Sequence, residues 1–406
     1  MKKNKINKKI IPSIIGLGYV GLPIFLRLNK KFKTIGFDID KSRIEQLSKK
    51  RDTNKEFNKN KLALYNKSLY SSEIKDLKKS NFYIVTVPTP IFKNNTPDLR
   101  NLVNVSNTLK KIVKKEDIIF FESTVYPGVT EKICVPIIES GSNLKNNKDF
   151  FVGYSPERIN PGDQNHSIEK INKIVAIKKD KLDKAKLVYK YLAKKLILTD
   201  KVQEAEASKV IENIQRDLNI GLMNEIYQVC LKSNINFKNV IKLAGSKWNF
   251  IKYNPGLVGG HCLPVDPYYF SWFAKKLKLD TKIILAGRKT NNDMIKFSKK
   301  IIIQKLKQYG LNPKKIRVLI LGLTYKQNVA DLRNSLSIKV FESLKNNFRK
   351  LSSYDPMIDK KFSKKYSLIN RNEIKNFDAY IVLTKHNSFK SIYKLMSKKI
   401  LIDIFS

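Results

Sequence analysis

Short apolar runs alternate with longer polar segments over the first 200 residues of the chain. The runs are rich in β-branched and aromatic residues, which favours strands, while the polar segments have the periodicity of helices. The expected strands are Ile11–Ile15, Thr34–Asp38, Tyr83–Val87, Ile118–Glu122, Phe150–Tyr154 and Ile174–Ile177. Strands that alternate with helices in this way are typical of a doubly wound parallel sheet.

The middle of the chain has a different pattern. Residues from Val202 to about Lys232 contain no Pro and one Gly, and their apolar positions recur at helical spacing, which predicts one long helix. A loop rich in Gly, Pro and aromatic residues follows over Trp248–Phe270, and further helix is expected to about Gln308. A helix as long as the first of these can join two domains and carry a dimer contact.

The alternation of strands and helices resumes after Asn312-Pro313. The expected strands are Arg317–Leu321, Leu351–Tyr354, Ala379–Leu383 and Ile400–Ile404. The predicted fold class is therefore α/β, with two Rossmann-like doubly wound domains joined by a central helical domain that contains one long helix. The predicted domains are 1–200, 201–312 and 313–406.

Positive charge is the main compositional feature. The 406 residues include 80 Lys and Arg against 35 Asp and Glu, a formal net charge of +45. Such a balance is typical of proteins that bind nucleic acids or membrane surfaces. Here the excess is mostly Lys, runs the length of the chain and accompanies heavy use of Asn and Ile, which indicates compositional bias. A nucleic-acid site would gather Arg and aromatic residues in one place, so we expect no nucleic-acid partner.

The three Cys and three His are too scattered for a zinc cluster, so no metal is expected. An odd number of thiols without a disulfide framework indicates a reducing compartment. The longest apolar runs are far shorter than the roughly 20 residues that cross a bilayer. We expect a cytoplasmic protein without a membrane partner.

A dinucleotide site is predicted at the first strand. Ile11–Ile15 leads into Gly16-Leu17-Gly18-Tyr19-Val20-Gly21, in which the glycines permit a tight turn and close approach to a pyrophosphate. Asp38 ends the next strand 17 residues after Gly21, near the usual separation for a carboxylate that binds the adenosine ribose. Asp38 would repel a 2′-phosphate, which favours NAD, although Arg43 lies close enough in sequence to accommodate an extra phosphate.

A second set of candidate residues suits acyl chemistry. Cys262 lies in the turn-prone segment Gly259-Gly260-His261-Cys262, and Asp266 follows four residues later. A thiol needs a positive or hydrogen-bonding environment to become a thiolate. On the long helix, the set Glu206, Lys209, Asn213 and Arg216 has a spacing that predicts one common face, where an ammonium and an amide can stabilise an oxyanion. The same spacing also occurs in exposed polar stripes, so the helix alone leaves both interpretations open.

Taken in order, the motifs resemble those of the UDP-glucose/GDP-mannose dehydrogenase family. The motifs are the Gly-x-Gly-Tyr-Val-Gly loop, Val87-Pro88-Thr89-Pro90, Glu122-Ser123-Thr124-Val125-Tyr126-Pro127-Gly128, Ser155-Pro156-Glu157-Arg158, the Lys209/Asn213 helix, Gly260-His261-Cys262 and Gly322-Leu323-Thr324-Tyr325-Lys326. The resemblance covers nearly the whole chain. It implies an NAD-dependent oxidoreductase, cofactor contacts that include Tyr19, Val20, Thr89 and Thr124, and a homodimer.

The family's chemistry is a four-electron oxidation, in which a sugar C6 alcohol becomes a carboxylate and two NAD are reduced. The resemblance implies that Cys262 adds to the aldehyde and that Lys209 and Asn213 stabilise the oxyanions. The base for the first step is either a water held by Thr124 and Asp266 or Lys209 itself, and Glu157 orients the hydrolytic water.

The resemblance also implies a UDP-sugar site in the C-terminal domain. The residues expected to contact the UDP-sugar are Glu157, Arg158, Lys209, Asn213, Tyr253, Gly256, Gly259, Gly260, Lys326 and Arg333. For Arg333, a solvated charge is an equally good interpretation.

Two differences from the UDP-glucose dehydrogenases of the family indicate which nucleotide sugar the resemblance favours. Pro264-Val265-Asp266 replaces Pro-Lys-Asp, and Arg158-Ile159-Asn160-Pro161-Gly162 lacks their second acid. Both changes resemble the UDP-N-acetyl-D-glucosamine/galactosamine 6-dehydrogenases of the Vi polysaccharide type, which serve surface polysaccharide (capsule or O-antigen) synthesis. UDP-N-acetylmannosamine and UDP-glucose stay open as substrates. A single-step NAD-dependent hydroxyacid-type dehydrogenase and a polyanion-binding protein are more distant alternatives.

Overall fold

The computed structural model describes residues 9–54, 56–63, 69–157, 168–396 and 399–405. The chain forms two compact units, Met1–Glu212 and Asn213–Ser406, and the division falls inside one long helix, α8 (Val202–Lys232). Within the described ranges, the protein has no helix that is both long and apolar enough to span a membrane.

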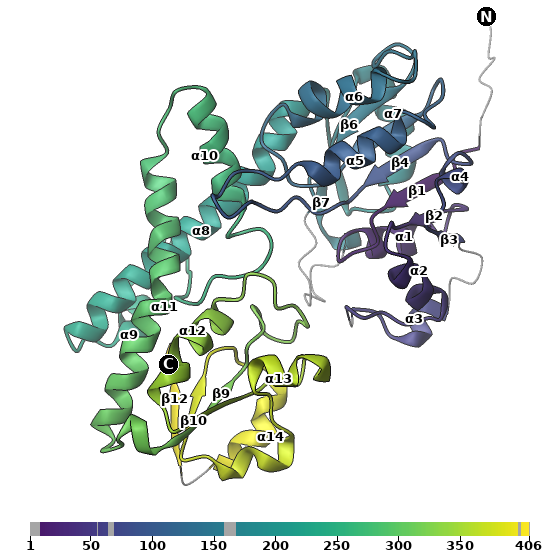
Figure 1. Ribbon diagram of the computed structural model, residues 1–406. Coiled ribbons are helices and arrows are strands. Elements are labelled where there is room, and N and C mark those ends of the chain that lie inside the picture. Colours follow the sequence, from purple (N-terminus) through teal and green to yellow (C-terminus); the bar gives the residue numbers. More distant parts are fainter. Residues whose placement is uncertain (1–8, 55, 64–68, 158–167, 397–398, 406) are drawn as a thin grey trace, which may run out of the picture. The chain divides into compact units, whose positions relative to one another are not determined.

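The first unit contains an eight-stranded sheet with the order β3-β2-β1-β4-β5-β6-β7-β8 (Figure 1). Its strands are β1 (Pro12–Ile15), β2 (Ile35–Phe37), β3 (Leu69–Ser71), β4 (Phe82–Val85), β5 (Ile118–Phe121), β6 (Phe151–Tyr154), β7 (Asn172–Ala176) and β8 (Lys195–Thr199). Its helices before α8 are α1 (Gly21–Leu28), α2 (Lys41–Ser48), α3 (Lys59–Ala63), α4 (Ile74–Leu77), α5 (Arg100–Leu109), the π-helix η1 (Thr130–Cys134), α6 (Val135–Glu139) and α7 (Leu182–Tyr189). All neighbouring strands are parallel except β6 and β7, which are antiparallel.

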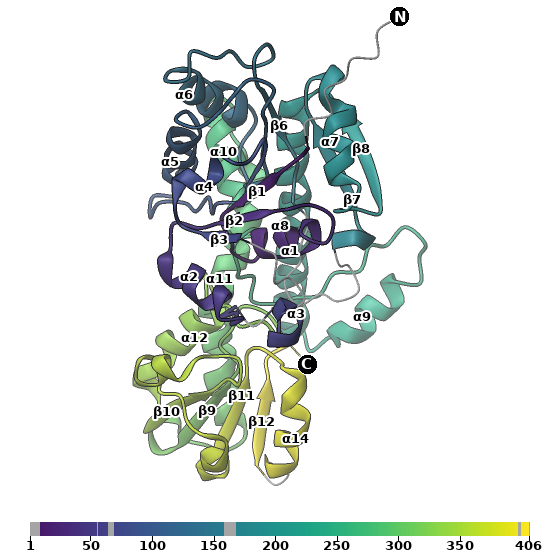
Figure 2. The same cartoon turned by 90° about the vertical axis from the view of Figure 1, so that its right-hand side faces the viewer.

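The second unit combines helices with a smaller sheet. Its helices are the second part of α8, α9 (Phe237–Ala244), α10 (Asp266–Lys276), α11 (Lys282–Gln308), α12 (Leu336–Leu344), α13 (Ser363–Tyr366) and α14 (Lys390–Tyr393). Its strands are β9 (Arg317–Leu321), β10 (Lys350–Tyr354), β11 (Ala379–Val382) and β12 (Ile400–Asp403). Figure 2 shows these strands side by side in the order β10-β9-β11-β12, and all of them are parallel.

The predicted α/β class is confirmed, and each expected strand begins and ends within two residues of its predicted bounds. Helix α8 has the predicted bounds. The sequence pattern missed β3, which has only three residues, and β8, an edge strand on which Ile197 and Leu198 are exposed. An edge strand with mixed exposure lacks the fully buried apolar run that marks a central strand.

Each sheet is covered by its own apolar core. In the first unit, Ile14, Ile84 and Phe120 from the strands pack with α1 and α7, and none of these three side chains is exposed. In the second unit, β9 and β11 pack against α11 and α12. Strands buried on both faces hold their carboxyl ends firmly, and Gly16, Asp38, Thr124 and Glu157 follow such ends.

Candidate active site

The predicted dinucleotide loop is a tight turn between β1 and α1. Gly16 has a φ of +97°, a conformation that favours glycine. A Cβ on Gly21 would lie 1.8 Å from the carbonyl oxygen of Gly16, so only glycine fits there. A Cβ on Gly18 would meet no atom within 4 Å, so this glycine leaves open space on the exposed side of the loop. That space suits the close approach of a pyrophosphate, and the loop therefore fits NAD.

Two neighbouring side chains brace this loop. The Asp38 carboxylate accepts a hydrogen bond from the backbone N–H of Leu17 at 2.8 Å. Asp38, the residue predicted to bind the ribose, therefore lies at the loop. The Thr86 hydroxyl, which the sequence reasoning missed, donates to the Gly16 carbonyl at 2.7 Å. Its position directly after β4 was the available signal, because strand ends meet the glycine loop at this edge of the sheet.

Arg43 lies behind the loop and is buried. Its Nε donates to the Leu17 carbonyl at 2.9 Å, and its Nη1 forms an ion pair with Asp52 at 2.9 Å. These contacts hold Arg43 as a brace of the glycine turn. Tyr19 and Val20 are half-buried in the same turn, and Thr89 is buried after β4.

Helix α8 brings Lys209 to the carboxyl end of β6. The Lys209 ammonium is buried and donates to the backbone carbonyl of Glu157 at 2.7 Å. Glu157 is itself buried, and Thr124 is half-buried directly after β5. Arg158 lies outside the described residues.

Glu206 ties α8 to the loop that follows Thr124. Its two carboxylate oxygens accept from the backbone N–H groups of Gly128, at 2.5 Å, and Thr130, at 2.9 Å. The side chain is fully buried, and this burial raises its pKa to about 7, although the two N–H groups act in the opposite direction. Glu206 therefore fixes the helix turn that carries Lys209.

In the second unit, Cys262 begins the turn that leads into α10. Its carbonyl accepts from the backbone N–H groups of Val265 and Asp266, both at 2.9 Å, and its side chain is half-buried. Asp266 is buried, and its carboxylate accepts from the side-chain amide of Asn213 at 2.6 Å. The structure thus brings Asn213 and Asp266 together, next to the turn that carries Cys262.

The polar side chains predicted on α8 are buried up to Asn213, which excludes an exposed polar stripe. The placement of Arg216 on this face is wrong, because Arg216 is exposed and Asp217 is buried instead. At about 100° per residue, position 217 lies about 20° from position 206 around the helix, and position 216 lies about 20° from position 209, so both positions border the same face. Helical spacing alone therefore does not separate Asp217 from Arg216, and only the packing of the helix does.

The glycines before Cys262 pack against the loop after β9. Gly260 has a φ of +92°, and a Cβ there would lie 2.7 Å from the Tyr325 ring. The side-chain amide of Asn334 donates to the Gly260 carbonyl at 3.0 Å. Burial, together with the positive charge of Arg333, lowers the pKa of His261 to about 4, so a neutral imidazole precedes the thiol at neutral pH.

The remaining residues predicted to hold the UDP-sugar lie apart along the second unit. Lys326 is half-buried after β9, and the exposed Arg333 forms an ion pair with Asp331 at 2.6 Å. Tyr253 is half-buried, and Gly256 is bound through its backbone to Asn224. Gly259 is buried against Asn334 and Tyr325.

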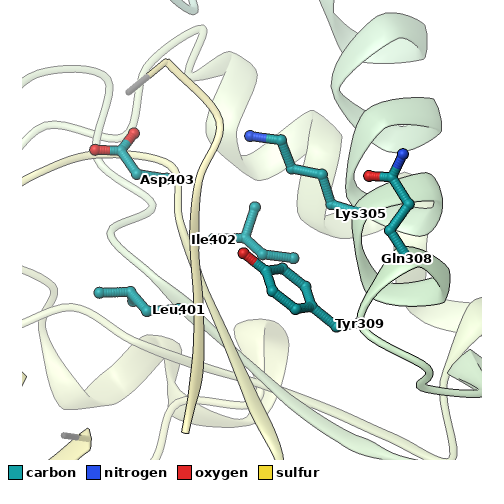
Figure 3. Close-up of a pocket in the computed structure, with 6 residues that line it drawn as sticks. All are labelled: Lys305, Gln308, Tyr309, Leu401, Ile402 and Asp403. Atoms are coloured by element: carbon teal, nitrogen blue, oxygen red, sulfur yellow. The ribbon is translucent and has the colours of Figure 1, made fainter.

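The second unit also has a cavity that lies outside the predicted site. A cavity of about 360 Å³ lies between the end of α11 and β12, lined by Lys305, Gln308, Tyr309, Leu401, Ile402 and Asp403 (Figure 3). It contains none of the predicted site residues. Within the described ranges, no three His, Cys, Asp or Glu side chains are grouped so that they could hold a metal ion.

A glycine-rich nucleotide loop on a mostly parallel sheet, with a separate thiol loop beside an amide and a carboxylate, is typical of an NAD-dependent dehydrogenase. Comparison with protein families gives the family. Residues 9–193 match the NAD binding domain of the UDP-glucose/GDP-mannose dehydrogenase family, residues 203–293 its central domain and residues 319–406 its UDP binding domain. The chain belongs to this family, and it is an oxidoreductase that uses NAD and a nucleotide sugar.

Known proteins resemble the chain over nearly its full length. Protein CapL of Staphylococcus aureus is 43% identical over 382 residues, which cover 93% of this chain and 90% of CapL. UDP-N-acetyl-D-glucosamine 6-dehydrogenase of Salmonella typhi is 41% identical, with 94% and 91% covered. The structure of UDP-D-ManNAc dehydrogenase from Pyrococcus horikoshii superposes with a TM-score of 0.86 at 28% identity, covering 97% of this chain and 95% of that one.

Proposed function

We propose that the protein oxidises the C6 hydroxyl of a UDP-N-acetylhexosamine, either the N-acetylglucosamine or the N-acetylgalactosamine nucleotide, to the carboxylate through a covalent bond to Cys262. The observation that carries the proposal is the hydrogen bond between Asn213 and Asp266 beside the Cys262 turn. Lys209 lies one helical turn before Asn213 on α8. A single-step alcohol dehydrogenase needs no thiol in such a setting.

The glycine loop and Asp38 would hold NAD, and the bound nicotinamide would provide a hydride acceptor for each of the two oxidations. In the first, the C6 hydroxyl loses its proton to a base, and two candidates stay open. Lys209 donates to the Glu157 carbonyl at 2.7 Å and would have to be neutral to accept a proton. A water held by Thr124 and Asp266 is the alternative, in which the buried Asp266 carboxylate orients the water that takes the proton.

In the second stage, the Cys262 sulfur bonds to the aldehyde carbon to form a thiohemiacetal. Its oxidation gives a thioester, and water then breaks the C–S bond, releasing the carboxylate and returning the thiol. Asn213 and the Lys209 ammonium stabilise the oxyanions of these steps. Glu157 orients the hydrolytic water. His261 does not supply a positive charge to the thiol, because its pKa of about 4 keeps it neutral.

We assign residues 313–406 to the UDP moiety, with Lys326 and Arg333 as phosphate or sugar contacts and Tyr253 and the Gly256–Gly260 segment around the diphosphate. Residues 1–200 bind NAD, and residues 201–312 carry the thiol loop. The family model that matches residues 319–406 supports the first assignment, because it is a UDP binding domain.

The choice of sugar rests on the relatives. Enzymes named for UDP-N-acetyl-D-glucosamine are 41% and 38% identical to the chain, whereas those named for UDP-N-acetyl-D-mannosamine are 29–34% identical. These identities favour the glucosamine nucleotide over the mannosamine one, and the sequence motifs keep the galactosamine nucleotide beside the glucosamine one. The likeness to CapL favours capsule synthesis as the pathway, with O-antigen synthesis as the alternative.

The test measures NADH formed per mole of limiting nucleotide sugar. It uses the N-acetylglucosamine, N-acetylgalactosamine, N-acetylmannosamine and glucose nucleotides in parallel. Wild type is expected to form two NADH per sugar, and Cys262→Ala to lose steady turnover. Cys230→Ala is the matched control, because this cysteine is buried on α8 and should not affect the ratio. One NADH with a free aldehyde as the product would contradict the proposal.

We also propose a homodimer through the helices of the second unit. Leu222 and Val229 on α8, Leu243 on α9 and Ile283 on α11 are each more than half exposed, and α9 buries none of its residues. Exposed apolar side chains in this number favour a protein partner, and a second copy of the chain could cover them. Light scattering at micromolar concentration should give twice the chain mass, and Leu222→Asp should shift it towards the monomer. A wild-type monomer would contradict the proposal.

We place the enzyme in the cytoplasm. Its three cysteines form no disulfide among the described residues, which suits a reducing compartment.

A further inference from the structure

A buried polar network joins α8 to α11 in the second unit. Arg288 donates to the Asp217 carboxylate, and Asn291 donates to the same carboxylate at 2.9 Å and to the Asp217 carbonyl at 2.8 Å. Asn224 donates to Asn291 at 2.8 Å. Each of these four side chains is at most 1% exposed.

The network holds the thiol loop on both sides of Cys262. Asn224 bonds Gly256 twice, accepting from its N–H at 2.8 Å and donating to its carbonyl at 3.1 Å. Arg288 donates to the carbonyl of Leu263, the residue after Cys262, at 3.3 Å. The loop between these two points includes the Gly259–Cys262 turn, so the network limits how far the sulfur can move.

Burying the charged groups of this network carries a free-energy cost. Burial raises the pKa of Asp217 to about 6, against the attraction of Arg288, and burial lowers the pKa of Arg288. Among the described residues, the Nε and Nη2 atoms of Arg288 have no hydrogen-bond partner. A well-packed apolar pair at such a position is often as stable as a buried ion pair, or more stable.

Close helix packing prevents the network from relaxing. A Cβ on Gly221 of α8 would lie 3.0 Å from the carbonyl oxygen of Gly287 on α11, and a Cβ on Gly287 would lie 2.4 Å from the Leu218 side chain. The two helices therefore meet at glycines next to Asp217 and Arg288. Their separation is fixed, and the hydrogen bonds transmit it to the loop.

We propose that Asp217 and Arg288, with Asn224 and Asn291, are positioning residues that hold the Cys262 sulfur where it meets the aldehyde carbon. This inference rests on the proposed function. Because the thiol acts only in the second oxidation, loss of the network should impair that oxidation more than the first. A displacement of about 1 Å at a reacting atom can cost roughly 100-fold in rate.

The test compares three proteins with wild type. Arg288→Lys keeps the charge but loses the guanidinium geometry, Asp217→Leu/Arg288→Met replaces the ion pair by an apolar pair, and Ile302→Val in α11 is the control for a mild core defect. Each is assayed for NADH per nucleotide sugar and for released aldehyde. The rate of Cys262 alkylation by iodoacetamide is followed from pH 6 to 10 by mass spectrometry, with thermal denaturation in parallel.

Arg288→Lys and Asp217→Leu/Arg288→Met are both expected to release aldehyde, so that the number of NADH formed per nucleotide sugar falls from two towards one. Oxidation of the aldehyde should be about 100-fold slower than in wild type. The KM for the nucleotide sugar should stay within about twofold of wild type, because the first oxidation does not use the thiol. Their alkylation profile should shift, since the loop is no longer fixed, while Ile302→Val should match wild type. An apolar pair that keeps the melting temperature, the ratio of two and the wild-type profile would overturn the inference. A ratio of one in wild type would instead overturn the proposed function, while the alkylation profiles would still decide the positioning role.

Discussion

Protonation of Glu206 should change the stability of the fold over the neutral range. The pKa of this buried carboxyl is about 7, against 4.5 for the ordinary group, a difference of 2.5. At 1.36 kcal/mol per pKa unit, this corresponds to about 3 kcal/mol. A raised pKa means that the stabilising contribution is complete below about pH 4.5 and is lost as the pH rises through 7, because the ionised form is then buried.

The neutral isostere Glu206→Gln removes this titration. We therefore expect the unfolding free energy of wild type, minus that of Glu206→Gln, to fall by about 3 kcal/mol as the pH rises, with most of the fall between pH 5 and 7.5. Urea unfolding of both proteins at matched ionic strength measures the difference. Glu225→Gln is the control, because Glu225 is exposed on α8 and is not among the charges that shift the pKa of Glu206.

A difference that rises with pH would refute this reasoning. It would mean that the N–H groups of Gly128 and Thr130 stabilise the carboxylate by more than burial penalises it, so that the pKa lies below 4.5. A flat difference would also refute it, because it would place the two effects in balance. The experiment thus decides which of two opposed effects controls the carboxyl that holds the Lys209 turn.

Two substitutions in the first unit test its buried contacts. Gly21→Ala places a Cβ 1.8 Å from the Gly16 carbonyl oxygen, so the cofactor loop must open. The Kd for NAD, measured by calorimetry, should rise about 100-fold. A Kd within threefold of wild type would contradict this. Lys173→Met breaks a buried ion pair with Glu122 at 2.8 Å and should destabilise by about 3–5 kcal/mol in thermal unfolding. Arg317→Met breaks an exposed pair that solvent screens, so it should destabilise much less than Lys173→Met; equal losses in the two variants would show that burial does not matter here.

The strands and the long helix were predictable from the sequence because their signals are local. Runs of β-branched and aromatic residues mark central strands, and the uninterrupted helical period from Val202 to Lys232 marks α8. The short strand β3 and the exposed strand β8 were not predictable in this way, since pairing at the edge of a sheet does not require a buried apolar run. The antiparallel pairing of β7 with β6 likewise has no signature in either strand.

For the site, the sequence by itself determined the chemistry on offer: a glycine loop followed by an acid, a cysteine among glycines, and an ammonium and an amide one helical turn apart. Residue type and spacing carry that information. Only the tertiary structure decided which groups meet, because the decisive contacts join residues far apart in the chain. Glu206 reaches Gly128 across 78 positions, and Arg288 reaches Asp217 across 71. Burial and hydrogen-bond partners determine whether such groups titrate, bind or position others, and both depend on how the helices pack.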